Sequence, residues 1–371
     1  MRGRSVDLLL VGFGHVGRRF VTLLNEIGAR LEADEGLTWR VVGIVTRTHG
    51  AALDPAGMDV GRALAVAERA GSVDLLHDSR QGAPPQNGVA AIRRAAAARD
   101  PARHFVVVET TVLDITSGQP AIDHVRAAIG CGAHVITANK GPAAFAYREL
   151  TSLAASAGVA FRFEGAVMDG IPIFNLVREL LPAVQVVGFR GIVNSTTNWI
   201  LTAMEDGTDA EAALREMEAA GVAEADTSLD LDGWDAAAKT AALANVLLGA
   251  DITPHAVARR GIRGLSRDAV RQALSRRSCI RLIASGRRTD GTLQTSVEPR
   301  ELPADDLLGR LRGMANALIL ETDLLGDVMI AELSGGLTQT AYALVTDLVG
   351  VTASVPPAMP PRRSLSPPAR R

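Results

Sequence analysis

The sequence is poor in cysteine, has no excess of charge of one sign and contains no long apolar run. Cys131 and Cys279 are too few for a disulfide framework, so we expect a reducing compartment, the cytoplasm. A net charge of −2 gives no general attraction for nucleic acid or an anionic membrane. No stretch approaches the roughly 20 apolar residues of a membrane-spanning helix. The short apolar run after Arg2 and Arg4 is interrupted by Gly12, which argues against a signal peptide.

The composition is that of a folded protein with two domains. At about 150 residues per domain, 371 residues predict two domains, and 47% hydrophobic with 22% charged residues excludes general disorder. Val355–Arg371 carries six prolines and two arginine pairs and has little to bury, so we expect a disordered tail over 351–371. A docking or targeting role is the alternative for this tail.

Residues 1–150 alternate short β-rich runs with amphipathic helical patterns. The expected strands are Val6–Val11, Trp39–Thr46, Phe105–Val108 and His134–Thr137. The expected helices are Val16–Ile27, Ala63–Ala70 and Ile122–Ile129. Apolar strands separated by helices indicate parallel pairing with both sheet faces covered, so this domain is predicted to be α/β.

Residues 151–320 have a different pattern, which predicts a mixed α+β domain without internal repeats. The expected helices are Pro172–Leu181, Thr197–Glu205, Ala210–Ala220 and Trp234–Leu248. The expected strands are Val159–Glu164, Gln185–Val193, Ile280–Ser285 and Thr292–Val297, the last two around the turn Asp290-Gly291.

A glycine-rich turn joins the first strand to the first helix. It reads Gly12, Phe13, Gly14, His15, Val16, Gly17. The glycines permit a tight turn and close approach of a pyrophosphate to the helix N-terminus, which indicates dinucleotide binding. A glycine turn without a ligand is the alternative. The second strand then ends without the acid that binds a ribose 2′-hydroxyl, and Arg47 there favours NADP(H) through its 2′-phosphate. A solvated surface arginine is the competing interpretation.

Three further segments carry polar groups at the ends of strands. Lys140 follows a parallel strand and is predicted to face the ligand crevice, against the alternative of an exposed loop lysine. Glu164 begins a turn of the kind that can bind a hard cation through oxygen, although by sequence alone an ordinary strand-to-helix turn is the better explanation. Asn194 precedes an apolar run and is expected to begin a helix, where free amides can also bind a substrate carboxylate.

The most informative block runs from Glu224 to Lys239. Asp232 is expected to cap a helix that continues to Leu248, which places Asp235 and Lys239 one turn apart on one face. Such a pair is usually a modest surface ion pair. Here alanines surround it, so the face should be buried. Burial lowers the pKa of a lysine whereas a neighbouring carboxylate opposes that shift, and the sequence leaves open which effect prevails.

Together these segments resemble the homoserine dehydrogenase family, in the same order and over nearly the whole chain to about Gly350. The resemblance is carried by Gly12–Gly17, Thr137–Lys140, Glu164–Pro172, Gly191–Leu201 and Glu224–Lys239. The last block is highly specific, whereas many enzymes share the glycine pattern. The resemblance implies a Rossmann-type dinucleotide-binding domain, followed by a domain for substrate binding and homodimer formation.

The resemblance further implies NAD(P)-dependent interconversion of L-homoserine and L-aspartate 4-semialdehyde by hydride transfer, in threonine, isoleucine and methionine biosynthesis. It assigns Lys239 as the acid/base with Asp235 beside it. The substrate-binding residues would be Glu224, Asp235, Lys140 and Thr196. The cofactor would contact the glycine turn and also Arg47, Thr110, Lys140 and Gly335. A sodium ion would bind the carboxylate of Glu164 and main-chain oxygens of Val167, Asp169 and Ile171.

The chain also departs from the family pattern. Ser195 stands where the family often has glycine. Gly335-Gly336 is a reduced form of the family's glycine-rich turn, and it lies within the segment 321–350, which is expected to return to the nucleotide domain. Only the Pro/Arg tail follows Gly350, so we expect no threonine feedback through an ACT domain. The rival functions are an NADP-dependent dehydrogenase of another amino-acid aldehyde or alcohol, and a non-catalytic cofactor-binding regulatory protein. The complete acid–acid–lysine set argues against the second.

Overall fold

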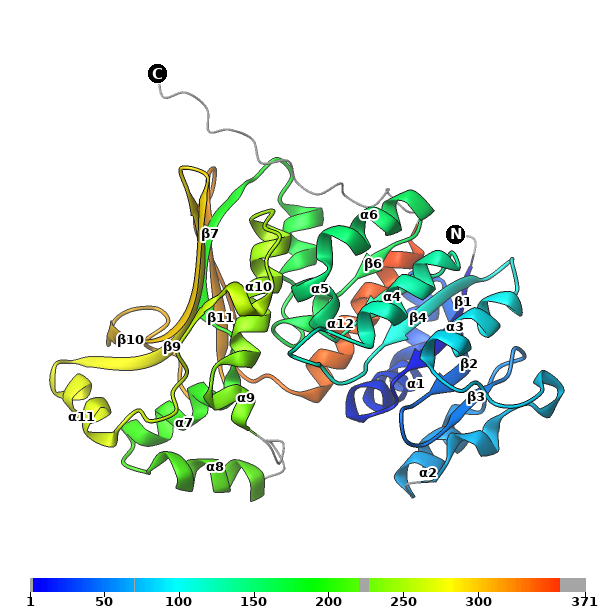
Figure 1. Cartoon of the computed structure of the whole chain (residues 1–371), viewed down its shortest axis with the longest axis horizontal. Helices are drawn as coiled ribbons and strands as arrows, with labels where there is room; N and C mark the ends of the chain where they lie inside the picture. The colour runs from blue at the N-terminus through cyan, green and yellow to red at the C-terminus, as the bar shows by residue number, and fades with distance from the viewer. Residues whose placement is uncertain (1–2, 70, 220–226, 354–371) are drawn as a thin grey trace. The chain divides into compact units, whose positions relative to one another are not determined.

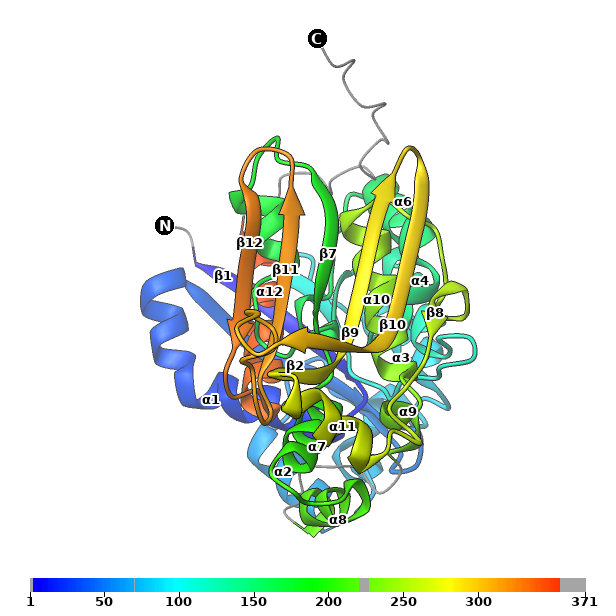
Figure 2. The ribbon, with the colours of Figure 1, turned by 90° about the vertical axis from the view of Figure 1, so that its left-hand side faces the viewer.

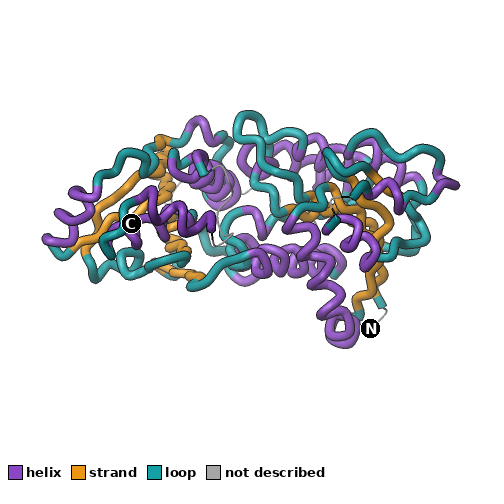
Figure 3. The backbone as a smooth tube through the Cα atoms, turned by 90° about the horizontal axis from the view of Figure 1, so that it is seen from below, coloured by secondary structure: helices purple, strands orange, loops and turns teal. Residues whose placement is uncertain are grey.

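A computed structural model describes residues 3–69, 71–219 and 227–353. The chain forms two units, each with its own sheet and helices (Figures 1 and 3). Within the described residues, the first unit comprises 3–142, 146–172 and 336–353, and the second comprises 143–145 and 173–335. The chain therefore leaves the first unit near residue 172 and returns to it at Gly336.

The first unit is built on a six-stranded sheet with the order β3-β2-β1-β4-β5-β6. Its strands are β1 Arg4–Val11, β2 Leu37–Val45, β3 Ala51–Leu53, β4 His104–Glu109, β5 His134–Thr137 and β6 Phe161–Arg162. All neighbours are parallel except β2 and β3, which are antiparallel. This order, with β1 central, is that of dinucleotide-binding folds, and it confirms the predicted α/β class.

Helices cover both faces of this sheet, as its apolar strands require. They are α1 His15–Glu35, α2 Val60–Glu68, α3 Gly88–Ala97, α4 Ala121–Gly130, α6 Tyr147–Ala157 and α12 Leu337–Thr352, with 3-10 turns η1 Val73–Leu76, η2 Ser79–Gln81 and η3 Glu164–Ala166. The helix α5, Gly141–Phe145, spans the boundary between the units. Phe20 and Leu24 of α1 share one core cluster with Leu344 and Leu348 of α12, so the last helix completes the first unit.

The second unit is built on a six-stranded sheet with the order β12-β11-β7-β9-β10-β8. Its strands are β7 Val186–Ile192, β8 Ala258–Arg259, β9 Ser278–Thr289, β10 Thr292–Pro303, β11 Asn316–Thr322 and β12 Gly326–Glu332. All pairs are antiparallel except β10 with β8. Asp290 and Gly291 join β9 to β10 with φ of 49° and 80°, the positive values of a two-residue hairpin turn, as predicted.

In the view of Figure 2, the helices of the second unit lie behind its sheet or beyond the lower ends of its strands. They are α7 Ser195–Glu205, α8 Ala210–Ala219, α9 Ser228–Leu231, α10 Trp234–Leu247 and α11 Arg267–Ser275, with the π-helical η4 Leu176–Leu180 and the 3-10 turn η5 Pro254–Ala256. Phe189, Val297 and Leu320 on the helix-covered face are at most 1% exposed. No described helix of this unit crosses the opposite face.

Several predicted boundaries were wrong because apolar patterning does not reveal which sheet a strand joins. Residues 159–164, assigned to the second domain, form only the short β6, which pairs with β5 of the first sheet, and then η3. The observed division accordingly lies near residue 172 rather than 150. Residues 321–335 belong to the second unit, and the return begins at Gly336.

The structure also bears on what the sequence predicted for the C-terminal tail, the cysteines and membrane-spanning helices. The final helix continues through Thr352, two residues into the predicted 351–371 tail, and the tail from 354 onward lies outside the described residues. Cys131 and Cys279 are free thiols. Among the described residues, every helix is too short or too polar to cross a bilayer.

Candidate functional site

The glycine turn after β1 leaves the first helix open at its amino end. Gly12 has a φ of 95°, and a Cβ atom there would lie 2.7 Å from the carbonyl oxygen of Thr110. A Cβ atom on Gly17 would lie 2.9 Å from the Gly12 carbonyl oxygen. Gly14 is the N-cap of α1, gives no side-chain hydrogen bond to the helix and has no atom within 4 Å of its Cβ position. The turn therefore presents backbone amides and open space, which fit a dinucleotide pyrophosphate.

The other predicted cofactor residues of the first unit lie at the carboxyl ends of neighbouring strands. Thr110 follows β4 and donates from Oγ1 to the Gly12 carbonyl oxygen at 3.0 Å, so it touches the glycine turn directly. Phe13 is buried, Val16 is half-buried, and His15 is exposed on the first turn of α1. Parallel sheets of this order bind their ligands at this edge.

Arg47 lies at the tip of a tight turn after β2. The Thr46 hydroxyl accepts from the His49 amide at 2.8 Å and donates to the Gly50 carbonyl oxygen at 3.0 Å, which closes the turn. Arg47 itself is exposed and forms no ion pair with a described residue. Its guanidinium is therefore available to an anion.

Lys140 is half-buried after β5, at the N-cap position of α5.

The predicted cation loop lies entirely in the first unit, against α12. Glu164 is 3% exposed, and its amide donates to the Asp347 carboxylate, itself fully buried, at 2.8 Å. Asp169 adopts a left-handed φ of 47° and accepts from Thr340 Oγ1 at 2.9 Å. The loop therefore holds the buried carboxyl group of Glu164 and is fastened to α12 through the Glu164 amide and the Asp169 carboxylate.

The main-chain oxygens of this loop add to the fit. Within the described residues, no hydrogen bond reaches the carbonyl oxygens of Val167, Asp169 or Ile171. One carboxylate and three carbonyl groups form an oxygen donor set suited to a hard cation. Clusters of three or more His, Cys, Asp or Glu side chains are absent from the described part of the chain, so a site built of side chains alone is not present there.

In the second unit, the predicted acid–lysine pair is formed and largely buried. Lys239 Nζ lies 3.0 Å from Asp235 Oδ2, and both side chains are 16% exposed. The same ammonium group donates to the Val193 carbonyl oxygen at 2.7 Å. Alanines 236, 237, 238 and 241 of α10 are buried around the pair, as the alanine-rich pattern predicted. Lys239 is thus oriented by two acceptors from two different segments.

Asn194 connects this pair to a second carboxylate. Its Nδ2 donates to Asp235 at 2.9 Å and to Asp230 of α9 at 2.6 Å, while its Oδ1 accepts from the Thr197 amide at 2.8 Å. Asn194 is therefore the predicted N-cap of α7 and also the link between two acids. Asp230 was not among the predicted site residues and Asn194 was predicted only to begin a helix, because α7 and α9 are separated in the chain by more than twenty residues.

The remaining predicted site residues have diverse placements. Thr196 is half-buried in the first turn of α7, and Ser195 Oγ accepts from Asn316 Nδ2 at 2.7 Å. Glu224 lies outside the described residues. Gly335 is half-buried just before Gly336, the N-cap of α12.

The prediction that Asp232 caps α10 was wrong. Gly233 is the N-cap, without a side-chain cap, and Asp232 instead forms an ion pair with Arg263 at 2.5 Å. That interaction lowers the pKa of Asp232. Arg259 donates to the Asp232 carbonyl oxygen and stacks 3.8 Å from the ring centroid of Trp234. These contacts hold the start of α10 in place.

One compositional signal would have pointed to the site. Of the 39 basic residues, only Lys140 and Lys239 are lysine, and the other 37 are arginine. A guanidinium stays protonated throughout the physiological pH range, whereas an ammonium group can release its proton when its surroundings demand it. The two lysines are thus the positions where arginine would not supply the same chemistry.

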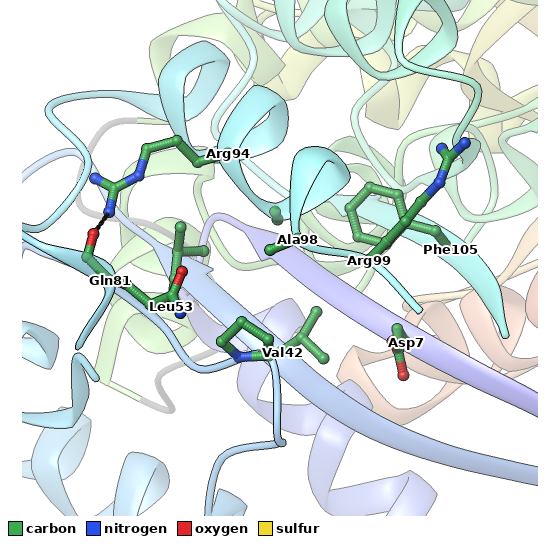
Figure 4. A pocket seen from close by; sticks show the side chains of 10 residues that line it. Asp7, Val42, Leu53, Gln81, Arg94, Ala98, Arg99 and Phe105 are labelled. Carbon is green, nitrogen blue, oxygen red and sulfur yellow. Dashed lines mark hydrogen bonds between the residues drawn. The ribbon is translucent and has the colours of Figure 1, made fainter. Parts of the chain in front are cut away.

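A buried pocket of the first unit, by contrast, is not a ligand site. It lies between the amino ends of β1 and β4, with Asp7 and Phe105 in its wall, while Arg94 donates to the Gln81 carbonyl oxygen beside it (Figure 4). Its cavity volume is about 10 Å³, which holds at most one water molecule. It is also at the opposite edge of the sheet from the glycine turn.

Comparison with known proteins agrees with this geometry. Residues 172–349 match the sequence model of homoserine dehydrogenase. The NAD(+)-dependent homoserine dehydrogenase of Pseudomonas canavaninivorans is 35% identical over 348 residues, which are 94% of this chain and 96% of the relative. The homoserine dehydrogenase of Methanocaldococcus jannaschii is 35% identical over 347 residues, 93% of this chain and 98% of the relative. The crystal structure of a homoserine dehydrogenase from Thiobacillus denitrificans has a TM-score of 0.78 and 29% identity, covering 97% of this chain and 78% of that one. The chain belongs to the homoserine dehydrogenase family.

Proposed function

We propose that this chain catalyses the reversible oxidation of L-homoserine to L-aspartate 4-semialdehyde with a nicotinamide dinucleotide, and that Lys239 is the acid/base. The observation that carries the proposal is the buried Asp235–Lys239 pair, in which the ammonium group is held by Asp235 and by the Val193 carbonyl oxygen. This arrangement fixes one proton-carrying group between acceptors from two different segments, in a buried setting where it can exchange a proton with a substrate oxygen.

A bound dinucleotide would supply the acceptor for the hydride of the alcohol carbon. Neutral Lys239 accepts the hydroxyl proton as that hydride leaves, and in the reverse direction its ammonium group donates a proton to the aldehyde oxygen. Asp230 and Asp235, together with Glu224, are suited to the substrate ammonium group. Thr196, in the first turn of α7, is suited to the substrate carboxylate. The substrate would thus be held by charges of both signs.

The cofactor part of the proposal rests on the first unit. The residues that would hold the dinucleotide are those of the glycine turn, Thr110, Lys140 and Gly335. We expect NADP(H) to be preferred, because exposed Arg47 stands after β2 where a 2′-phosphate would lie. A sodium ion is proposed for the loop of Glu164, Val167, Asp169 and Ile171 on the strength of its oxygen donors.

The assembly part of the proposal rests on the second sheet. Its face opposite α10 carries charged pairs, such as Arg287 with Glu321 at 2.5 Å, and has no described helix across it (Figure 2). A second copy related by a two-fold axis would cover this face, so we propose a homodimer. We also propose a cytoplasmic location, because both cysteines are free thiols.

Initial rates of dinucleotide reduction by the purified protein test this function. We expect homoserine to support turnover with NADP+ and, more weakly, with NAD+. L-serine and L-threonine serve as matched substrates, since they carry the same amino-acid group on a different alcohol. Faster turnover with either of them, or none with homoserine, would contradict the proposed substrate.

A further inference from the structure

A buried carboxylate at the end of β4 has no place in the proposed chemistry. The strand runs through four buried apolar residues, 105–108, and then ends in Glu109, whose exposure is 0%. Burying a carboxylate costs free energy unless hydrogen bonds compensate it. An apolar residue would continue the strand at no such cost. The position therefore requires an explanation in terms of what the carboxylate binds.

The carboxylate fastens the loop that follows its own strand. Glu109 Oε1 accepts from the Thr111 amide at 3.2 Å and from the Thr111 hydroxyl. The neighbouring Thr110 donates from its amide to the Val11 carbonyl oxygen at 2.8 Å and from Oγ1 to that of Gly12 at 3.0 Å. Holding Thr111 thus holds Thr110 against the glycine turn.

The same side chain reaches the loop after β5. Thr137 Oγ1 lies 2.8 Å from the Glu109 main-chain carbonyl oxygen and 3.1 Å from Glu109 Oε2, so its one proton is shared between the two, and it accepts from the Asn139 amide at 2.9 Å. Asn139 Nδ2 donates to the Thr111 carbonyl oxygen at 2.9 Å, and its Oδ1 accepts from the Gly141 amide at 2.8 Å. The two loops are therefore joined twice, once through Glu109 and once through Asn139. Lys140 lies between Asn139 and Gly141 in the chain.

A histidine backs the carboxylate from the far side. His124 of α4 is 6% exposed, and its Nδ1 lies 3.5 Å from Glu109 Oε1 without a hydrogen bond to any described residue. A proton on Nδ1 makes this contact attractive, because two lone pairs would otherwise face each other. Glu109 thus accepts hydrogen bonds from its own loop and from β5, and its far side lies against the His124 ring of α4.

We propose that Glu109 is a positioning residue for the dinucleotide. It holds the loops after β4 and β5 against the glycine turn, so that Thr110 and Lys140 are in place before the cofactor binds. Preorganised loops lose less conformational entropy on binding, so removing the fastening should weaken the dinucleotide more than it slows the chemical step. The inference rests on the proposed function, because it assumes that this edge binds the dinucleotide.

The test compares Glu109→Ala with Asp7→Ala. Asp7 is a matched control because it is a carboxylate 2% exposed in the same sheet, bonded to Arg40 and Arg103 at the opposite edge. Both variants should melt at lower temperature than the parent. In direct fluorescence titrations with NADPH and NADH, we expect the Kd of Glu109→Ala to rise about tenfold, as for the loss of a charged hydrogen bond. We expect that of Asp7→Ala to stay within about twofold of the parent.

Steady-state rates separate positioning from general damage. A partly unfolded enzyme loses kcat at unchanged KM, whereas Glu109→Ala should raise the KM for the dinucleotide and retain most of kcat at saturation. Glu109→Gln keeps an acceptor oxygen and should recover most of the affinity. Should Glu109→Ala not fold, Thr111→Val removes one donor to the same carboxylate and should raise the Kd about threefold.

Several results would overturn the inference. One is a dinucleotide Kd like that of the parent in Glu109→Ala or, if that variant does not fold, in Thr111→Val. Another is a rise in the dinucleotide Kd of Asp7→Ala as large as that of Glu109→Ala. A parent that binds neither dinucleotide overturns both this inference and the proposed function. A parent that binds a dinucleotide but does not oxidise homoserine overturns only the proposed function, and the Kd comparison still decides the role of Glu109.

Discussion

The two units build their proposed binding sites from different materials. In the first unit, the glycine turn offers backbone amides and space, and its geometry depends on the absence of side chains at Gly12 and Gly17. In the second unit, the cluster around Lys239 consists of side chains from three elements, joined by Asn194. The glycine turn is formed by backbone groups of one short segment, whereas the cluster around Lys239 is formed by charged and polar side chains from distant segments.

This difference teaches where each site is vulnerable. A backbone site tolerates changes at exposed positions but not an added Cβ atom at a crowded glycine. A cluster of charges is sensitive to any single partner, because removing one leaves the others buried without compensation. We therefore expect substitutions in the second unit to affect turnover, and substitutions in the first to affect cofactor affinity.

The largest expected effect is that of Lys239→Arg. The substitution keeps a positive charge beside Asp235 but replaces the ammonium group by one that does not give up its proton at working pH. We expect kcat to fall about 10²–10⁴-fold, as on loss of a positioned acid/base, while the Kd for NADPH remains that of the parent. Stopped assays with homoserine and fluorescence titration measure the two quantities.

Lys239→Ala extends this test by removing the charge as well. It should be equally inactive and should also bind NADPH normally. Near-normal kcat in either variant would exclude Lys239 as the proton carrier, and a large loss of NADPH affinity would contradict the assignment of the two functions to separate units.

The next effect is expected at Asn194, which is both a helix cap and a link between acids. Asn194→Asp keeps the oxygen that caps α7 but adds a third negative charge beside Asp230 and Asp235. We expect the KM for homoserine to rise about tenfold, from loss of a hydrogen bond to a charged group. The melting temperature should also fall, because the new carboxylate would be buried beside two others. Asn194→Ala should raise KM and also lose about 1 kcal/mol of stability with the cap.

These two variants separate capping from linking. If both leave the KM for homoserine unchanged and only Asn194→Ala lowers the melting temperature, Asn194 is a cap and nothing more. Thermal melts and initial rates at fixed dinucleotide concentration provide both measurements.

A smaller effect is expected from Arg47→Ala in the first unit. If Arg47 binds the 2′-phosphate, the KM for NADP+ rises about tenfold, as for loss of one charged hydrogen bond, and that for NAD+ changes little. Arg62, on α2 of the same unit, serves as a surface-arginine control. Equal changes for the two cofactors would refute the role of Arg47.

The stability of the first unit should depend on pH through His134, which begins β5. Burial lowers the pKa of His134 to about 4, below its value of 6.5 in the unfolded chain. The unfolded state therefore binds more protons, so this contribution to stability is present above pH 6.5 and is lost as the pH falls toward 4. His134→Asn should have a melting temperature that declines less steeply over this range. Parallel melting curves for parent and variant would contradict the role of His134.

The smallest effect is expected from deleting residues 354–371. The deletion begins after α12, so it spares the buried Val351 and Thr352 that end the core of the first unit. We expect an unchanged dimer mass by light scattering and unchanged homoserine oxidation. A monomeric full-length protein would contradict the proposed dimer, and a dimer lost only on deletion would move the interface to the tail.

Patterns within one element were predictable from the sequence, and partners between elements were not. The strand His134–Thr137 was predicted to the residue, because its apolar run ends in polar residues. The strand expected at 159–164 was placed in the wrong domain, because pairing with β5 depends on the path of the chain and not on local composition. Asp232 looked like a helix cap by position, yet Arg263 binds it from a segment thirty residues away.

By itself, the sequence determined the glycine-rich turn after the first strand, the i,i+4 spacing of Asp235 and Lys239, and the family to which the chain is similar. These are properties of short segments, set by glycine at crowded positions and by the helical period. Only the tertiary structure decided that Val193, Asn194 and Asp230 meet this pair, and that Glu109 joins two loops. Those contacts depend on how strands and helices pack across long separations, where the burial of many side chains, rather than any local signal, selects the partner.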